Sequence, residues 1–321
     1  MRNLIDISII IPTFNSARSV RDCLEAIRDN TYPEERVEIV IVDNGSKDET
    51  LSIAGEFTRH IHVDRKASVS RLRNIGVSRA RGEIIGFVDS DCIISTGWIK
   101  RSVETGKENR VNFGLAGFPY SLPDNPGWIE LAWNSTILGR EGKRKFISAG
   151  NMVVRRDTFL KLGGFNESLI TGEDYELCQR IREKGLAIIF DEGLKSKHLG
   201  NPKTLYQLFK KEVWYGKGMV GTMRHEFFSK PFFLAVIYLL LTFTILFGLY
   251  RYWARNETGI LLASLVCYVF IPVFIALHKA SKPIRYRLLS QLIPIYFVYI
   301  LGRMVSLFYL FKTTKRDTAT V

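Results

Sequence analysis

The chain has 321 residues, room for one large domain or two modest ones with real cores. Its four cysteines are scattered, with no CxxC pair and no histidine at ligand spacing, so the pattern suggests neither a disulfide framework nor a zinc site. The formal net charge is +13, and many of the basic residues flank apolar segments, which favours anionic lipid over nucleic acid as the partner.

The first elements along the chain alternate between strands and helices. Short β-branched runs predict buried strands at residues 7–12, 37–42, 60–63 and 84–88. Between these runs, apolar residues recur at helical spacing and predict three intervening helices. Such alternation predicts right-handed βαβ units, and therefore an α/β fold with a mostly parallel sheet flanked by helices.

The following region is less regular. Residues 118–128 are rich in Pro, Gly and Asn and predict a loop, whereas residues 146–154 predict a strand. Helices are predicted for residues 157–162 and 173–184, the latter with an acidic start. The stretch 203–214 places apolar residues between lysines, a pattern typical of a helix that lies on a membrane surface.

Three apolar stretches near the C-terminus are candidate membrane spans. Residues 232–250, 259–277 and 288–310 approach or exceed the roughly 20 residues that a helix needs to cross a bilayer. The first stretch is uncharged, whereas the third contains Arg303 together with a glutamine and a proline. The sequence therefore predicts a soluble domain at 1–225 and a membrane domain at 226–321 with two to three spans.

The orientation follows from the basic residues. They precede the first apolar stretch and separate the second from the third, which predicts that the N-terminal domain faces the cytoplasm of a multi-pass cell-membrane protein. No secretory signal is expected, because the run 7–12 is too short for a signal core. Three full crossings would place the basic residues Lys312, Lys315 and Arg316 outside, so the crossing of the third stretch stays open.

Polar side chains follow the predicted strands where each strand ends. They are Asn15, Asp43, Asp89 and Asp91. Ligands of parallel α/β sheets bind at the carboxyl ends of the strands, so we expect these four side chains to line one crevice.

Asp89-Ser90-Asp91 is the candidate metal site. Two carboxylates at a strand end can reach one hard cation such as Mg²⁺ or Mn²⁺, which would neutralise a diphosphate leaving group. The same triplet also occurs in ordinary surface turns, and its position at the end of a buried strand favours the metal site. His198 is a candidate third ligand, with a structural role as the alternative.

The other candidates each have an ordinary structural alternative. Asp43 suits either a turn or a hydrogen bond to a base or ribose. Arg71 and Arg73 suit either a solvated helix face or bidentate phosphate contacts. Glu173 and Asp174 suit either a helix cap or a general base that deprotonates a hydroxyl.

Together these residues resemble the family-2 glycosyltransferases of the GT-A fold, over roughly residues 7–190. Five segments carry the resemblance in the family's order: Ser8-Ile-Ile-Ile-Pro12-Thr13-Phe-Asn15, residues 38–50 around Asp43, residues 73–76, Phe87-Val-Asp89-Ser-Asp91, and residues 151–174 ending in Gly-Glu173-Asp174.

The resemblance implies an inverting, metal-dependent sugar transfer from a nucleoside-diphosphate sugar. It implies Asp174 as the catalytic base, Asp91 as the main ligand of Mg²⁺ or Mn²⁺, Asp89 on the ribose or the shared metal, and Asp43 on the nucleotide base. Donor contacts are likewise implied for the opening segment through Pro12, Thr13 and Asn15, and substrate contacts for Arg71, Arg73 and Glu173.

The expected acceptor is membrane-borne. A hydroxyl of a lipid-linked saccharide is the leading expectation, because an already ionised polyprenyl phosphate has less need of Asp174. A polyprenyl-phosphate glycosyl synthase and a non-catalytic nucleotide-sugar-binding scaffold are the alternatives. The family's processive synthases carry Gln-x-x-Arg-Trp after the base, and this chain lacks it, which disfavours processive synthesis.

Overall fold

The computed structural model describes residues 5–108, 112–136, 146–221, 230–280 and 287–309. The chain forms two compact units. The first comprises Met1–Asp124 and Gly142–Gly200, and the second comprises Asn125–Glu141 and Asn201–Val321. The second unit therefore combines the C-terminal part of the chain with one short segment from its middle.

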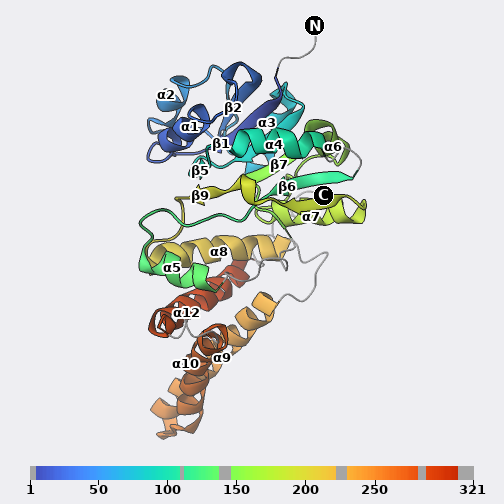
Figure 1. Cartoon of the computed structure of the whole chain (residues 1–321). Coiled ribbons are helices and arrows are strands. Elements are labelled where there is room, and N and C mark those ends of the chain that lie inside the picture. The colour runs from blue at the N-terminus through green and yellow to red at the C-terminus, as the bar shows by residue number, and fades with distance from the viewer. Residues whose placement is uncertain (1–4, 109–111, 137–145, 222–229, 281–286, 310–321) are drawn as a thin grey trace. The chain divides into compact units, whose positions relative to one another are not determined.

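A seven-stranded sheet with the order β3-β2-β1-β4-β7-β6-β8 organises the first unit (Figure 1). Its strands are β1 (Ile7–Thr13), β2 (Val37–Asp43), β3 (Ile61–Val63), β4 (Ile84–Val88), β6 (Phe113–Gly117), β7 (Asn151–Arg155) and β8 (Ala187–Phe190). Strands β3, β2, β1 and β4 are parallel to one another, as are β6 and β8, and only β7 runs antiparallel to its neighbours within the described sheet. The predicted mostly parallel α/β sheet is thus confirmed, although β6 and β8 were not predicted.

Helices cover both faces of this sheet. One face is covered by α1 (Val20–Arg28), α2 (Thr50–Gly55) and α4 (Trp98–Glu108), and the other by α3 (Val69–Arg79), α6 (Arg156–Lys161) and α7 (Glu173–Glu183). Strand β1 shows why both faces are apolar: Ile9 and Ile11 belong to the first core, whereas Ile10 belongs to the second. Continuous β-branched runs are typical of strands buried on both faces.

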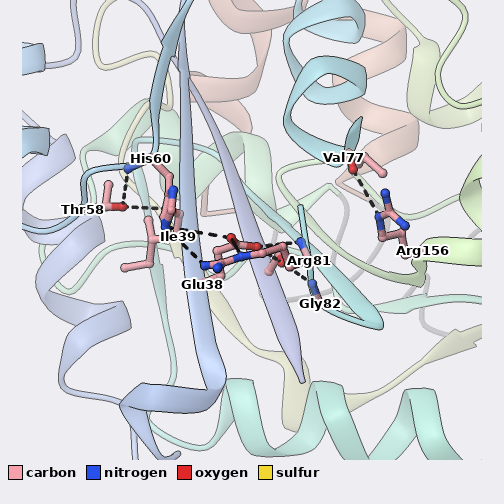
Figure 2. A network of polar contacts seen from close by, with 9 residues as sticks. Glu38, Ile39, Thr58, His60, Val77, Arg81, Gly82 and Arg156 are labelled. Carbon is pink, nitrogen blue, oxygen red and sulfur yellow. Dashed lines mark hydrogen bonds and ion pairs between the residues drawn. The ribbon is translucent and has the colours of Figure 1, made fainter. Parts of the chain in front are cut away.

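A buried polar network joins the starts of the central strands. Glu38 of β2 accepts from the Ser8 hydroxyl of β1 at 2.6 Å and from Nε of Arg81 at 2.7 Å, and Figure 2 shows Arg81 and Gly82 around this carboxylate. Burial by itself would raise the pKa of Glu38, but these hydrogen bonds lower it below its usual value. A Cβ on Gly82 would lie 2.5 Å from the Ser8 nitrogen, so only glycine fits this turn. The network ties the sheet together at the edge opposite the strand ends that carry the candidate site.

A second, two-stranded sheet lies in the same unit. Strand β5 (Cys92–Ile94) follows β4 after a turn and pairs antiparallel with β9 (Ser196–His198). The 3-10 turns η1 (Glu34–Arg36) and η2 (Glu192–Leu194) precede β2 and β9. The pairing brings residues about a hundred positions apart into register, which the local sequence pattern did not predict.

The second unit is helical. It contains α5 (Trp128–Ser135), α8 (Leu205–Gly221), α9 (Lys230–Arg255), α10 (Gly259–Lys279) and α12 (Leu289–Ser306), the last followed by the 3-10 turn η4 (Leu307–Tyr309). Three of its helices, Lys230–Arg255, Gly259–Lys279 and Leu289–Tyr309, are long and apolar enough to cross a membrane. This confirms the three predicted apolar helices and indicates a membrane protein.

Candidate functional site

The carboxyl ends of β1, β2 and β4 carry the polar side chains singled out in the sequence. Thr13 ends β1 opposite Asp43 at the end of β2, and Asp89 follows directly on β4. All three strands are parallel, so these residues lie along one edge of the sheet. The fold therefore gathers the strand-end residues as the βαβ pattern predicts.

Asp43 is fully buried, and its carboxylate is held by its own surroundings. Oδ1 accepts from the backbone N–H groups of Gly45 at 2.8 Å and Ser46 at 2.7 Å, while Oδ2 accepts from the hydroxyls of Thr13 at 2.7 Å and Ser46 at 2.6 Å. Four donors match the roughly four acceptor sites of an ionised carboxylate. Asp43 thus holds the β1 and β2 ends together.

Hydrogen bonds join the loop after β1 to the loop after β2. Asn15 adopts a left-handed backbone with φ 49°, its N–H donates to Ser46 Oγ at 2.8 Å, and its Oδ1 accepts from the N–H of Lys47 at 2.9 Å. Pro12 is buried inside β1. Phe14, beside it, is 56% exposed at this strand end, and the sequence reasoning missed it. The sequence signal that could have identified Phe14 is an aromatic residue directly after a predicted strand, among polar residues.

Arg73 connects the strand end to the acidic start of α7. Its side chain is only 4% exposed; Nη2 donates to Asp89 Oδ1 at 2.6 Å and Nη1 donates to Glu173 Oε1 at 2.8 Å. Burial alone would lower the pKa of this guanidinium, but the two carboxylates raise it above its ordinary value, so Arg73 is charged. The ring of Phe165 lies 5.6 Å from the guanidinium carbon.

Arg71 has a different environment from Arg73. Its side chain is half-exposed on α3, where Nε donates to Asp64 at 2.8 Å and Nη1 lies 3.5 Å from a carboxylate oxygen of Glu167. The helical spacing of two residues separates the two arginines onto different faces, one inward and one outward.

Asp174 stands at the beginning of α7, after Gly172, whose φ of 84° suits glycine. Burial raises the pKa of its carboxyl to about 7, helped by the adjacent charge of Glu173 and opposed by hydrogen bonds from the backbone N–H groups of Tyr175 and Ala149. A carboxylate that titrates near neutrality is suited to accepting a proton in a reaction.

Asp91 and His198 meet through the β5–β9 pairing. Nε2 of His198 lies 3.6 Å from Asp91 Oδ1, and the Leu199 N–H donates to the Asp91 carbonyl at 2.8 Å. Together with Cys92, their ligand atoms all lie within 4.8 Å of one another. Burial holds the pKa of the Cys92 thiol well above its usual value, so its sulfur is protonated and the carboxylate and imidazole are the better ligands.

Tyr120 and Gly150 complete the surroundings of Asp89, and sequence reasoning singled out neither. A Cβ on Gly150 would lie 2.0 Å from Asp89 Oδ2 and 2.3 Å from the Tyr120 hydroxyl, so only glycine admits both groups. The centre of the Tyr120 ring also lies 4.8 Å from that of the His198 ring, with the two planes tilted by 33°. Neighbouring Asn151 is buried, and its Oδ1 accepts a hydrogen bond from the Trp98 indole N–H at 2.8 Å, which fixes the start of β7 beside Gly150.

The arrangement offers two chemical groups close to one sheet edge. The Asp91 oxygen and the His198 nitrogen are close enough together to bind one divalent cation. A site with one imidazole and one carboxylate suits Mn²⁺ better than Mg²⁺, which prefers oxygen ligands. Asp174 presents a base that titrates near neutrality. A cation and a base are what a displacement of an anionic leaving group by a hydroxyl requires.

Comparison with known proteins identifies the same kind of fold. A model for glycosyl transferase family 2 matches residues 8–162, and a model for glycosyl transferase family group 2 matches residues 132–278. The mannosyltransferase PcManGT from Pyrobaculum calidifontis, solved in complex with GDP-Man and Mn²⁺, superposes with a TM-score of 0.60 at 15% identity, covering 95% of this chain and 86% of that one.

Curated relatives extend the similarity to sequence. Glycosyltransferase AglE of Haloferax volcanii is 29% identical over 223 residues, 67% of this chain and 73% of the relative. A Methanococcus voltae protein named dolichyl N-acetyl-alpha-D-glucosaminyl phosphate 3-beta-D-2,3-diacetamido-2,3-dideoxy-beta-D-glucuronosyltransferase is 23% identical over 299 residues, 87% of this chain and 89% of the relative.

Proposed function

Since this chain belongs to glycosyl transferase family 2, we propose that it transfers a single sugar from a nucleoside-diphosphate sugar to a hydroxyl of a lipid-linked saccharide. One observation carries the proposal: Arg73 bonds both Asp89, at the end of β4, and Glu173, the neighbour of Asp174. A single buried guanidinium therefore ties the expected donor side of the site to the expected base.

The acceptor class follows from Asp174. A sugar hydroxyl keeps its proton at neutral pH and needs a base as it attacks, whereas a phosphate oxygen is already ionised. A pKa of about 7 suits Asp174 to that task, because the carboxyl is substantially deprotonated at neutral pH yet still basic. The Methanococcus voltae relative, named for a sugar linked to dolichyl phosphate, supports a lipid-linked saccharide as acceptor.

The donor and the cation are proposed from the strand-end residues. Asp91 and His198 would hold a divalent cation, preferably Mn²⁺, which when bound neutralises the diphosphate and makes it a better leaving group. Asp89 is already bonded to Arg73, so it would contact the ribose or contribute to the cation only through its second oxygen. The GDP-Man and Mn²⁺ bound to the Pyrobaculum enzyme support a nucleotide-sugar donor and a divalent cation.

The proposed step is one inverting displacement. Asp174 takes the proton of the acceptor hydroxyl, and the oxygen forms a bond to the anomeric carbon. The bond from that carbon to the diphosphate oxygen breaks, and the electron pair leaves with the nucleoside diphosphate. Glu173, pinned by Arg73, fixes the start of α7 and with it the direction in which Asp174 faces.

The test uses the full chain in lipid nanodiscs with radiolabelled nucleotide sugars. Two acceptors are offered, a lipid-linked saccharide extract and a polyprenyl phosphate, each with EDTA or with added Mn²⁺. Transfer to the saccharide that needs the cation is expected, with a loss of about 10²–10⁴-fold in Asp174→Asn and no change in the matched control Asp22→Asn, which is exposed on α1.

Three outcomes would contradict parts of the proposal. Transfer to polyprenyl phosphate alone would show that the acceptor is a lipid phosphate and not a saccharide hydroxyl. Undiminished transfer in EDTA would show that the reaction needs no divalent cation. Binding of nucleotide sugar without turnover on either acceptor would favour a scaffold that retains the fold without the chemistry.

A further inference from the structure

The third apolar helix differs from the other two in how it is covered. Within the second unit, 44% of the apolar window of Leu289–Tyr309 is buried by protein, against 17% for each of Lys230–Arg255 and Gly259–Lys279. A helix that spans a bilayer presents most of its apolar surface to lipid. Protein therefore covers a larger share of α12 with η4 than of α9 or α10, which sets α12 apart from the two helices that lipid can surround.

Helix α8 lies along α12 for most of its length. Gly302 of α12 packs against Glu212, because a Cβ there would lie 2.7 Å from that residue's Cβ. Further along, a Cβ on Gly216 would lie 2.0 Å from the Ser306 hydroxyl, and Nζ of Lys217 lies 4.0 Å from the centre of the Tyr309 ring. The two helices therefore run side by side in the same direction.

An ion pair is enclosed between these two helices. Arg303 of α12 bonds Glu212 of α8 at 2.9 Å, and their side chains are 15% and 4% exposed. The guanidinium also lies over the rings of Tyr215 and Tyr299. The charge of Arg303 is thus satisfied by α8, and α12 depends on α8 as its neighbour.

The composition of α8 excludes it from the hydrocarbon core. It carries Lys210, Lys211 and Lys217, and a charged side chain at the centre of a bilayer costs at least about 2.5–3.5 kcal/mol. Its outer face exposes Tyr206 and Trp214, with Nζ of Lys210 4.4 Å from the centre of the Tyr206 ring. Aromatic rings next to lysines are typical of the headgroup level of a membrane.

Helix α5 contacts the middle of the third apolar helix. The ring of Trp133 lies 5.8 Å from that of Tyr299 and 6.1 Å from that of Tyr296. Tyr299 is the midpoint of Leu289–Tyr309, which would lie at the bilayer centre if this helix crossed. The excursion that contains α5 leaves the first unit at Asp124 and returns to it at Gly142, so both of its ends connect to the water-exposed sheet domain.

We propose that α5, α8 and α12 form a layer at the lipid headgroups on the side of the membrane that holds the first unit, and that only α9 and α10 of the three candidate helices cross. The exposed lysine and aromatic face of α8 fits anionic headgroups. Two crossings return the chain to its starting side, so Lys312, Lys315 and Arg316 share the side of the first unit, as the positive-inside rule favours.

Labelling of introduced cysteines with a membrane-impermeant maleimide tests the topology. Sealed vesicles carry the full chain with Asp22→Cys in α1, Thr258→Cys between α9 and α10, or Thr318→Cys near the C-terminus. Positions 22 and 318 should react from one side and 258 from the other. Labelling of 258 and 318 from the same side, opposite 22, indicates three crossings and overturns the proposal, as does labelling of all three from one side.

The parent chain is the control for native thiols. Cys23, Cys92 and Cys178 are buried, whereas Cys267 is exposed on α10. Lipid covers Cys267 if α10 crosses, so the parent chain should label only weakly. Depth is measured separately with spin labels at Trp214→Cys and Phe270→Cys, by comparing collision with oxygen and with a water-soluble nickel chelate. The α8 label should report the headgroup level and the α10 label the hydrocarbon core. Equal depth for the two labels would overturn the headgroup placement of α8.

Discussion

Glu173 accepts a hydrogen bond from Arg73 at 2.8 Å although the two residues stand 100 positions apart in the sequence. The other arm of the same guanidinium bonds Asp89 at 2.6 Å. A planar fork of donors reaches two carboxylates at once, which a lysine ammonium cannot reproduce. The first helix turn of α7 is therefore held against the end of β4 by one side chain.

Replacing Arg73 should damage both activity and folding. Arg73→Met leaves Asp89 and Glu173 without their partner, and loss of one member of a buried ion pair typically costs about 3–5 kcal/mol. Chemical denaturation measures this loss, and Arg73→Lys should recover part of the stability while kcat stays at least about tenfold reduced. Arg28→Lys, at an exposed arginine of α1, is the matched control with near-normal values. Normal kcat in Arg73→Lys would show that the fork is dispensable.

The rate should depend on pH through Asp174. Its folded pKa is about 7, so kcat/KM of the wild type should rise with pH and level off above neutrality. The raised pKa also means that the folded state binds this proton more tightly than the unfolded state, with its ordinary value of 3.8. The stabilisation is therefore complete below pH 4 and lost as the pH rises through 7.

Asp174→Asn separates these two effects. The variant should be nearly inactive, yet its free energy of unfolding at pH 8 should exceed that of the wild type, because no buried carboxylate must ionise. Denaturation curves at pH 5 and pH 8 provide the comparison. A variant less stable than the wild type at pH 8 would refute the raised pKa.

Cation affinity should depend on the Asp91–His198 pair. His198→Ala and Asp91→Asn should each weaken Mn²⁺ binding by at least about 10-fold, because each removes one proposed ligand and the loss of an outer-shell partner alone has that effect. Electron paramagnetic resonance counts free Mn²⁺ directly and needs no turnover. His60→Ala is the matched control, because His60 belongs to the network around Glu38 at the opposite edge of the sheet (Figure 2). Unchanged Mn²⁺ affinity in both variants would show that the cation binds elsewhere.

Asp43 should prove to be a structural residue as much as a recognition residue. Asp43→Asn turns an amide N–H₂ towards groups that are themselves donors, which should lower the free energy of unfolding by about 1–3 kcal/mol. Thr13→Val, which removes one donor and keeps the carboxylate, should cost less. If Asp43→Asn raised KM for the donor and left stability unchanged, base recognition would be its sole role.

The sequence pattern predicted the strands and helices of the first half of the chain, because their apolar residues repeat at strand or helix spacing. Strand β4 was predicted with its observed bounds, and the positions of Asp43 and Asp89 at strand ends follow from the βαβ alternation. The antiparallel insertion of β7 between β4 and β6 was not predictable, because register between distant strands is decided by tertiary packing.

Burial and long-range pairing also lay beyond the sequence. Arg71 and Arg73 read alike as charges at a helix start, yet one is half-exposed and the other is 4% exposed. His198 was a candidate ligand by residue type alone, and only the β5–β9 register places it beside Asp91. Helical residues from 128 were missed because the aromatic and polar start of α5 has no repeat long enough to show a period.

Strand β9 ends at His198, two residues before Gly200, where the first unit ends. The backbone at this point is clamped twice, by the bond from the His198 N–H to the Ser121 carbonyl and by the bond from the Leu199 N–H to the Asp91 carbonyl. The chain therefore continues towards the membrane helices from a point directly beside the His198 imidazole. These two bonds therefore fix the position of the imidazole at the point where the chain leaves the first unit.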